Sequence, residues 1–241
     1  MDMFTIDTKK IQTVLFDLDG VVTKTAKTHA VAWKELFDEY LQAKGEPPFE
    51  EEDYRRYVDG RPRYDGVETF LQSRGIVLPR GTSEDSPEEE TICGLGNRKN
   101  QIFHNVLKEH GVECYESSIN LIKELRKKGV KTAVVSSSKN SSTVLEAANI
   151  SDLFDTSVDG LELERLFLHG KPEPDMFLEA AKRLGAEPKR TIVVEDAISG
   201  VQAGKKGGFI VIGVDRANTK EALSTAGADI VVNDLSLVGV E

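Results

Sequence analysis

The chain has little of what marks a secreted or membrane-bound protein. Only two of its 241 residues are cysteines, Cys93 and Cys114, and neither a C-x-x-C pair nor a histidine cluster accompanies them, which argues against a disulfide framework or a zinc site. No stretch reaches the roughly 18 apolar residues of a membrane span, and the sequence MDMFTIDTKK at the start holds no apolar signal core. We therefore expect a cytoplasmic protein with reduced thiols and no membrane partner.

Positive charges are fewer than negative ones. Lysine and arginine together number 31 against 41 aspartates and glutamates, so the formal net charge is -10, and the acids are spread along the whole chain. Such a charge repels nucleic acids and anionic lipid surfaces. The apolar content of 39% is enough to bury a substantial core. We expect a globular monomer that acts on a small molecule and binds no nucleic acid.

Short runs of β-branched residues recur along the chain and are typical of strands buried on both faces. The runs are residues 11–16, 130–136, 191–195, 209–214 and 228–232, and the amphipathic stretches that alternate with four of them are 119–129, 140–150, 175–185 and 197–207. This alternation predicts an α/β fold, a doubly wound parallel sheet whose strands are joined by right-handed helical crossovers.

The segment 25–110 interrupts this alternation. It contains helix-like stretches at 29–44, 65–75 and 97–111 and no strand-like run. We interpret it as an inserted α-helical cap domain, so that residues 1–24 and 111–241 form the core. Within the insert, residues 79–91 are polar, acidic and rich in turn residues, which predicts an exposed loop.

Two acids, Asp17 and Asp19, follow the first predicted strand. Ligands of parallel sheets bind beyond the carboxyl ends of the strands. Alternate residues point the same way, so the two carboxylates raise each other's pKa unless a cation neutralises them, and Mg2+ is a suitable hard cation. The alternative is a turn with two solvated acids.

Polar residues also follow the other predicted strands. Ser136 opens the run SSSKN after the second strand, Lys171 lies between a glycine and a proline in GKPEPD, and Glu195 and Asp196 end the strand TIVVED. Hydroxyls at a helix start can bind phosphate oxygens, a lysine can neutralise them, and a second acid pair can complete a metal site. Taken singly, these are ordinarily a helix cap, a surface lysine and a turn.

In this order, the D-x-D-x-x-x-T motif, the serine, the lysine and the E-D pair resemble the haloacid dehalogenase superfamily. The resemblance covers the whole core and implies an aspartyl-phosphate mechanism with Asp17 as nucleophile and Asp19 as general acid and base. It further implies Mg2+ held by Asp17, by the backbone carbonyl of Asp19 and by the E-D acids, chiefly Asp196. Ser136 and Lys171 would bind the phosphoryl group.

The insert is similar to that of the β-phosphoglucomutase subfamily. The run THAVAW contains His29, which matches a cap histidine that helps control the acid-base aspartate. The run VDGRPRYDG contains Arg61, and NRKN contains Lys99. The resemblance implies that both of these residues contact the sugar phosphate. SSSKN matches the S-x-S-K-N of that subfamily. The remaining implied substrate contacts are Thr23, Ser138, Lys139 and Asn140.

The sequence departs from the subfamily at Lys24, where relatives carry an acid, at CYESS (114–118), and in the long acidic loop 79–91. The predicted function is interconversion of β-glucose 1-phosphate and glucose 6-phosphate through a bisphosphate. A phosphatase acting on a sugar phosphate or another small ester is the alternative, because it would use the same core with water as acceptor. A non-enzymatic binding module is a third possibility, which the complete acid-lysine set disfavours.

Overall fold

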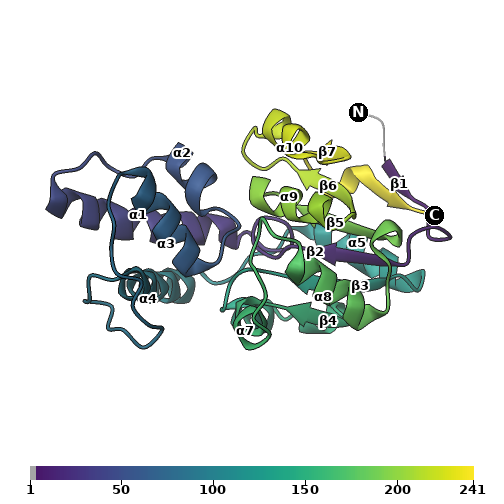
Figure 1. Ribbon diagram of the computed structural model, residues 1–241. Helices are drawn as coiled ribbons and strands as arrows, with labels where there is room; N and C mark the ends of the chain where they lie inside the picture. Colours follow the sequence, from purple (N-terminus) through teal and green to yellow (C-terminus); the bar gives the residue numbers. More distant parts are fainter. Residues whose placement is uncertain (1–3) are drawn as a thin grey trace. The chain divides into compact units, whose positions relative to one another are not determined.

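The computed structural model describes residues 4–241 and separates into two compact units (Figure 1). One unit comprises the chain up to Lys24 together with Glu113–Glu241, and the other is Thr25–Val112. The predicted fold class, an α/β core with an inserted helical domain, is confirmed. The second crossing between the units lies two residues beyond the position expected from the sequence: the preceding helix ends at His110 as expected, but Gly111 and Val112 still belong to the second unit.

A six-stranded parallel sheet is the centre of the first unit. Its strands are β2 (Thr13–Phe16), β3 (Lys131–Val135), β4 (Thr156–Val158), β5 (Thr191–Glu195), β6 (Ile210–Val214) and β7 (Ile230–Val232). Their spatial order is β4-β3-β2-β5-β6-β7. The chain therefore builds outward from β2 first on one side and then on the other, and the reversal makes the carboxyl end of β2 a topological switch point, where ligands of such sheets bind.

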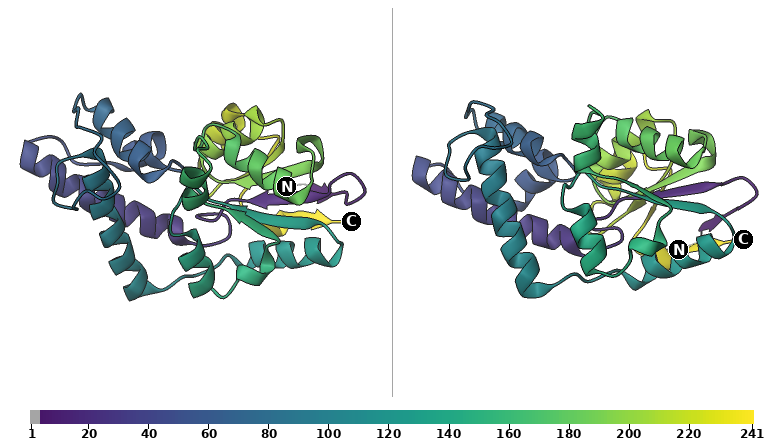
Figure 2. Two further views of the ribbon diagram at one scale, coloured as in Figure 1. Left: turned by 60° about the horizontal axis from the view of Figure 1, so that its bottom comes forward. Right: turned by 90° about the horizontal axis from the view of Figure 1, so that it is seen from below.

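Helices cover both faces of this sheet, as the burial of its strands requires (Figures 1 and 2). Leu15, Val193 and Val211 on adjacent strands pack with Phe177 and Val201 on one face. Figure 1 shows α5 (Glu116–Lys127) behind the sheet and α8 (Asp175–Leu184) in front of it. The helices of this unit are α5 (Glu116–Lys127), α6 (Ser141–Ala147), α7 (Gly160–Arg165), α8 (Asp175–Leu184), α9 (Ile198–Lys206) and α10 (Lys220–Ala226), with 3-10 turns at Ser151–Leu153, Pro188–Arg190 and Leu235–Leu237.

Three short strands were not expected from the sequence. β4 extends the sheet beyond β3, and β1 (Phe4–Ile6) pairs in parallel with β8 (Val238–Val240) as a separate ribbon. Each has three residues, and none is an uninterrupted run of β-branched residues like the equally short β7, so none stands out from the surrounding loop.

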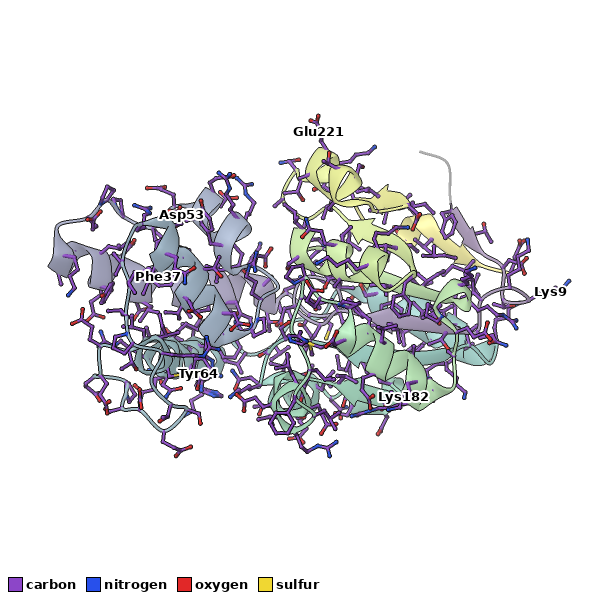
Figure 3. The ribbon with its side chains drawn as sticks, in the orientation of Figure 1. Lys9, Phe37, Asp53, Tyr64, Lys182 and Glu221 are labelled. Atoms are coloured by element: carbon purple, nitrogen blue, oxygen red, sulfur yellow. The ribbon has the colours of Figure 1, made fainter. Side chains whose placement is uncertain are left out.

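The second unit is a set of helices around an aromatic core. It consists of α1 (Thr25–Lys44), α2 (Glu51–Asp53), a π-helical segment (Tyr54–Val58), α3 (Arg63–Ser73) and α4 (Ile92–His110). The ring of Phe37 lies 4.3 Å from that of Phe70 and 5.0 Å from that of Phe49, measured between ring centroids. Figure 3 shows Phe37 among these helices. Within the described residues, no helix is both long and apolar enough to cross a membrane.

The acidic loop 79–91 contains no helix or strand but is attached to α4. The hydroxyl of Thr91 accepts the Gly94 N–H at 2.9 Å and donates to Asp85 at 2.6 Å. The side-chain amide of Asn97 donates to the backbone carbonyls of Ser83 and Asp85. The loop is thus a capping structure for the start of α4 as well as a surface segment.

The aromatic core of the second unit leads to a stability prediction. Phe70→Ala should lower the free energy of unfolding by about 3–5 kcal/mol, because it empties a fully buried ring position. Phe167→Ala is the control, since that ring is 92% exposed, and should change stability by less than about 0.5 kcal/mol. Urea unfolding followed by circular dichroism measures both, and equal losses would contradict the assignment of Phe70 to the core.

Candidate active site

Asp17 and Asp19 lie at the carboxyl end of β2. The Asp17 N–H donates to the Val194 carbonyl at 2.9 Å, which continues the pairing of β2 with β5. One carboxylate oxygen of Asp19 accepts the Ser136 hydroxyl at 3.3 Å. The predicted partners from the ends of β2, β3 and β5 therefore converge at the switch point.

Gly20 makes this convergence possible. Its φ is +93°, and a Cβ added there would lie only 1.8 Å from Oδ2 of Asp196. A side chain at this position would strain the backbone and displace the Asp196 carboxylate. The glycine after the D-x-D pair thus provides both the turn and the space in which Asp196 approaches it.

Lys171 is fully buried between two carboxylates. Its Nζ lies 2.5 Å from Oδ1 of Asp17 and 2.5 Å from Oε1 of Glu195, and 3.3 Å from the Val135 carbonyl. The other oxygen of Glu195 accepts the Ala197 N–H at 3.0 Å. Both carboxylate oxygens of Glu195 are therefore engaged, and its position holds Lys171 against Asp17.

The pKa shifts follow from this packing. Burial by itself would lower the pKa of Lys171, but the Asp17 and Glu195 carboxylates raise it above its ordinary value, so the ammonium stays protonated. Burial raises the pKa of Asp17; Lys171 opposes that rise, whereas the Glu195 and Asp19 charges add to it. The Lys171 ammonium alone thus does not balance the negative charges of Asp17, Glu195 and Asp19.

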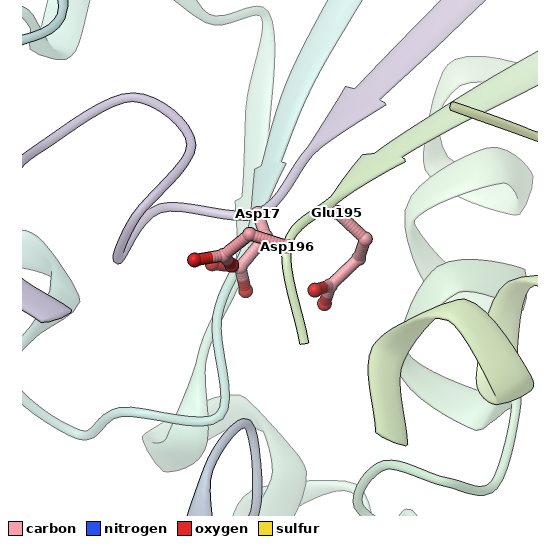
Figure 4. Close-up of side chains that lie close together, drawn as sticks. All are labelled: Asp17, Glu195 and Asp196. Carbon is pink, nitrogen blue, oxygen red and sulfur yellow. The ribbon is translucent and has the colours of Figure 1, made fainter. Parts of the chain in front are cut away.

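The same acids form a candidate metal centre, shown in Figure 4. Carboxylate oxygens of Asp17, Glu195 and Asp196 lie within 4.8 Å of one another. An all-oxygen donor set with excess negative charge fits Mg2+. Because both oxygens of Glu195 already accept hydrogen bonds, Asp196 and the second oxygen of Asp17 are the better ligand candidates.

The predicted phosphate-binding run folds into a turn between β3 and α6. The Ser136 hydroxyl accepts the Ser138 N–H, and the Ser138 hydroxyl accepts the Asn140 N–H, each at 3.1 Å. Lys139 forms an ion pair with Glu164. These hydroxyls therefore stabilise the turn before α6, and Ser136 also contacts Asp19.

Thr23 is bound to the loop that carries Asp19. Its side chain is fully buried, and its hydroxyl donates to the Leu18 carbonyl at 3.1 Å. This bond closes the loop that carries Asp19. The substrate-binding role predicted for Thr23 gains no support from this position.

In the second unit, the structure brings His29 and Lys99 together. Nζ of Lys99 lies 2.5 Å from Nδ1 of His29 and 4.9 Å above the centroids of the Trp33 and Phe103 rings. Arg61 lies in the turn before α3, and its backbone N–H donates to the Val58 carbonyl. Among the described residues its guanidinium has no ion-pair partner, whereas Lys99 is 3% exposed and committed to His29.

A parallel α/β sheet with a carboxylate cluster and a buried lysine at its carboxyl edge is an arrangement suited to phosphoryl transfer, because it combines a nucleophile, oxygen ligands for a cation and a positive charge. Comparison with known proteins makes this specific: residues 11–208 match the haloacid dehalogenase-like hydrolases. The chain belongs to this family.

Individual relatives extend the match over nearly the whole chain. β-Phosphoglucomutase of Mycobacterium bovis is 43% identical over 239 residues, which cover 95% of this chain and 91% of the relative. A phosphorylated carbohydrates phosphatase of Thermotoga maritima is 27% identical, covering 95% and 98%. The crystal structure of β-phosphoglucomutase from Clostridium difficile superposes with a TM-score of 0.71 at 27% identity, covering 93% and 92%.

The buried lysine leads to the second prediction. Lys171→Met should lower the free energy of unfolding by about 3–5 kcal/mol, because it leaves Asp17 and Glu195 buried without a cation. Lys205→Met is the matched control, since Lys205 pairs with Asp229 at 2.8 Å with side chains 34% and 41% exposed, and should cost less than about 1 kcal/mol. Chemical denaturation compares the two variants, and equal losses would show that the Lys171 pairs contribute no more than a surface ion pair.

Proposed function

We propose that this protein transfers phosphoryl groups through an aspartyl-phosphate formed on Asp17, with Mg2+ as cofactor. The observation that carries the proposal is the contact of 2.5 Å between Asp17 and the buried ammonium of Lys171 at the switch point of the sheet. A carboxylate attacks an anionic phosphate only where positive charge offsets their repulsion. Lys171 supplies one such charge, and Mg2+, held by Asp17 and Asp196, would neutralise more and orient the phosphate.

The remaining core residues then have distinct tasks. Asp19 protonates the leaving oxygen and later removes the proton from the attacking hydroxyl, and the Ser136 hydroxyl at 3.3 Å helps to fix its carboxylate. Glu195 fixes the position of Lys171. Ser136 and Lys171 also bind the oxygens of the transferring group.

We propose further that the acceptor is a sugar hydroxyl, so that the reaction interconverts β-glucose 1-phosphate and glucose 6-phosphate. The similarity to β-phosphoglucomutases at 43% identity supports this choice. Hydrolysis of a sugar phosphate is the second candidate, supported by the similarity to a carbohydrate phosphatase. The two reactions share every step up to the aspartyl-phosphate and differ in whether a hydroxyl or water attacks it.

The helical unit supplies the residues that would recognise the sugar phosphate. Arg61 presents a guanidinium without a described partner, and a planar fork of this kind suits bidentate phosphate binding. Lys99 and His29 form one partly buried pair, which we propose acts as a unit on the substrate rather than as two separate contacts.

A phosphorus NMR time course tests the reaction. With Mg2+, β-glucose 1-phosphate and a trace of the 1,6-bisphosphate, the enzyme should accumulate glucose 6-phosphate. Asp17→Asn should show no turnover, because an amide is not a nucleophile toward phosphorus. Stoichiometric release of inorganic phosphate would assign the hydrolytic reaction instead, and normal turnover by Asp17→Asn would remove Asp17 from its role.

Arg61→Ala tests the part played by the helical unit. It should slow the mutase reaction by about 10-fold or more through loss of a phosphate contact, while hydrolysis of 4-nitrophenyl phosphate, which has no second phosphate, stays within about twofold. Arg56→Ala is the control, because Arg56 is a nearby exposed arginine of the same unit. Equal effects on both substrates, or equal effects of both variants, would contradict a phosphate contact by Arg61.

A further inference from the structure

Arg216, in the loop after β6, binds the backbone of the Asp19 turn. Its Nε donates to the Gly20 carbonyl at 2.9 Å, and its guanidinium lies 3.7 Å from the centroid of the Tyr115 ring. On the other side it contacts the Asn233 carbonyl at 3.3 Å and the Asp234 carboxylate at 3.5 Å. The side chain is 16% exposed.

The Tyr115 segment in turn pairs with the chain just beyond Gly20. The Tyr115 N–H donates to the Val22 carbonyl at 3.0 Å, and the Ser118 hydroxyl donates to the Val21 carbonyl at 2.6 Å. Nζ of Lys24 lies 2.7 Å from the Glu113 carboxylate. The lysine that departs from the family pattern therefore adds an ion pair between the same two segments. The two segments through which the chain leaves and re-enters the core are thereby fastened side by side.

Arg216 holds this position at a cost. Its Nη2 is buried and has no hydrogen-bond partner in the described part of the chain, and an unsatisfied buried donor is unfavourable. The stacking on Tyr115 and the bond to Gly20 offset that cost. An arginine that served only for packing would lie more favourably with the whole guanidinium in water.

We propose that Arg216 is a positioning residue for the acid-base step: through the Gly20 carbonyl and the Tyr115 ring it holds the turn from which Asp19 extends. Gly20 follows Asp19 directly, and its N–H closes the turn by donating to the Thr23 carbonyl at 2.7 Å. Without Arg216 the Gly20 carbonyl loses this hydrogen bond. The turn can then rotate, and the Asp19 carboxylate moves with it. The inference rests on the proposed role of Asp19 in phosphoryl transfer.

The test compares leaving groups, because only a poor leaving group needs a proton from Asp19. Arg216→Met should reduce turnover of β-glucose 1-phosphate by about 10- to 100-fold, and the rate of the 4-nitrophenolate burst from 4-nitrophenyl phosphate, which reports formation of the aspartyl-phosphate before Asp19 acts as base, by less than about threefold. Arg190→Met is the matched control, since Arg190 also donates to backbone carbonyls, those of Lys9 and Lys10, and both rates should stay at wild-type values. Equal losses on the two substrates would assign Arg216 a general structural role and overturn the proposal.

Hydrogen exchange gives a readout that does not depend on activity. Arg216→Met should speed amide exchange in peptides covering 18–24 and 113–118, and Arg190→Met should not; unchanged exchange in both would also overturn the proposal. If Arg216→Met fails to fold, Arg216→Lys, which keeps the charge near Asp234 but loses the planar group over Tyr115, should show the same leaving-group selectivity to a smaller degree. A wild-type enzyme inert toward both esters would instead refute the proposed function, and the exchange experiment would still decide the contact.

Discussion

The arrangement of the core site depends on the two buried ion pairs that the Lys171 ammonium forms with Asp17 and Glu195. The ammonium joins the carboxyl ends of β2 and β5 to the loop that leads into α8. None of the three charges could be buried alone, because the desolvation of an unpaired ion far exceeds the gain from packing it. The surrounding backbone is adapted to this group: a Cβ at Gly200 would lie 1.8 Å from Oε1 of Glu195, so α9 can pass this close to Glu195 only with a glycine there.

Much of the core site could be predicted from the sequence, for a simple geometric reason. In a parallel sheet the residues after each strand meet at one edge, so Asp17, Ser136 and Glu195 had to be neighbours once their strands were recognised. Lys171 follows no strand directly, and its placement there came from resemblance to a family. The long helices of the insert were equally accessible, because a 3.6-residue pattern sustained over several turns is a strong signal.

What the sequence could not give is the pairing of side chains across distant segments. Glu195 was expected at the metal, and it lies with Asp17 and Asp196 in the candidate metal group; that it also accepts a hydrogen bond from Lys171 depends on which of its oxygens faces which neighbour. His29 and Lys99 were expected as separate contacts but form one pair, because α1 and α4 pack against each other. Arg216 carried no signal at all, since a lone arginine after a strand is usually solvated surface.

The charges at the site also imply an order of binding. Asp17, Asp19, Glu195 and Asp196 bring four carboxylates to one edge of the sheet, and the Lys171 ammonium contacts two of them, Asp17 and Glu195. A phosphate dianion approaching this cluster meets net repulsion, and the overall charge of -10 adds to it at long range. A divalent cation removes most of that repulsion and is itself attracted by the same field. In the proposed function, Mg2+ held by Asp17 and Asp196 would therefore bind before the sugar phosphate or together with it, because it would supply the positive charge that the phosphate dianion needs at this acidic edge.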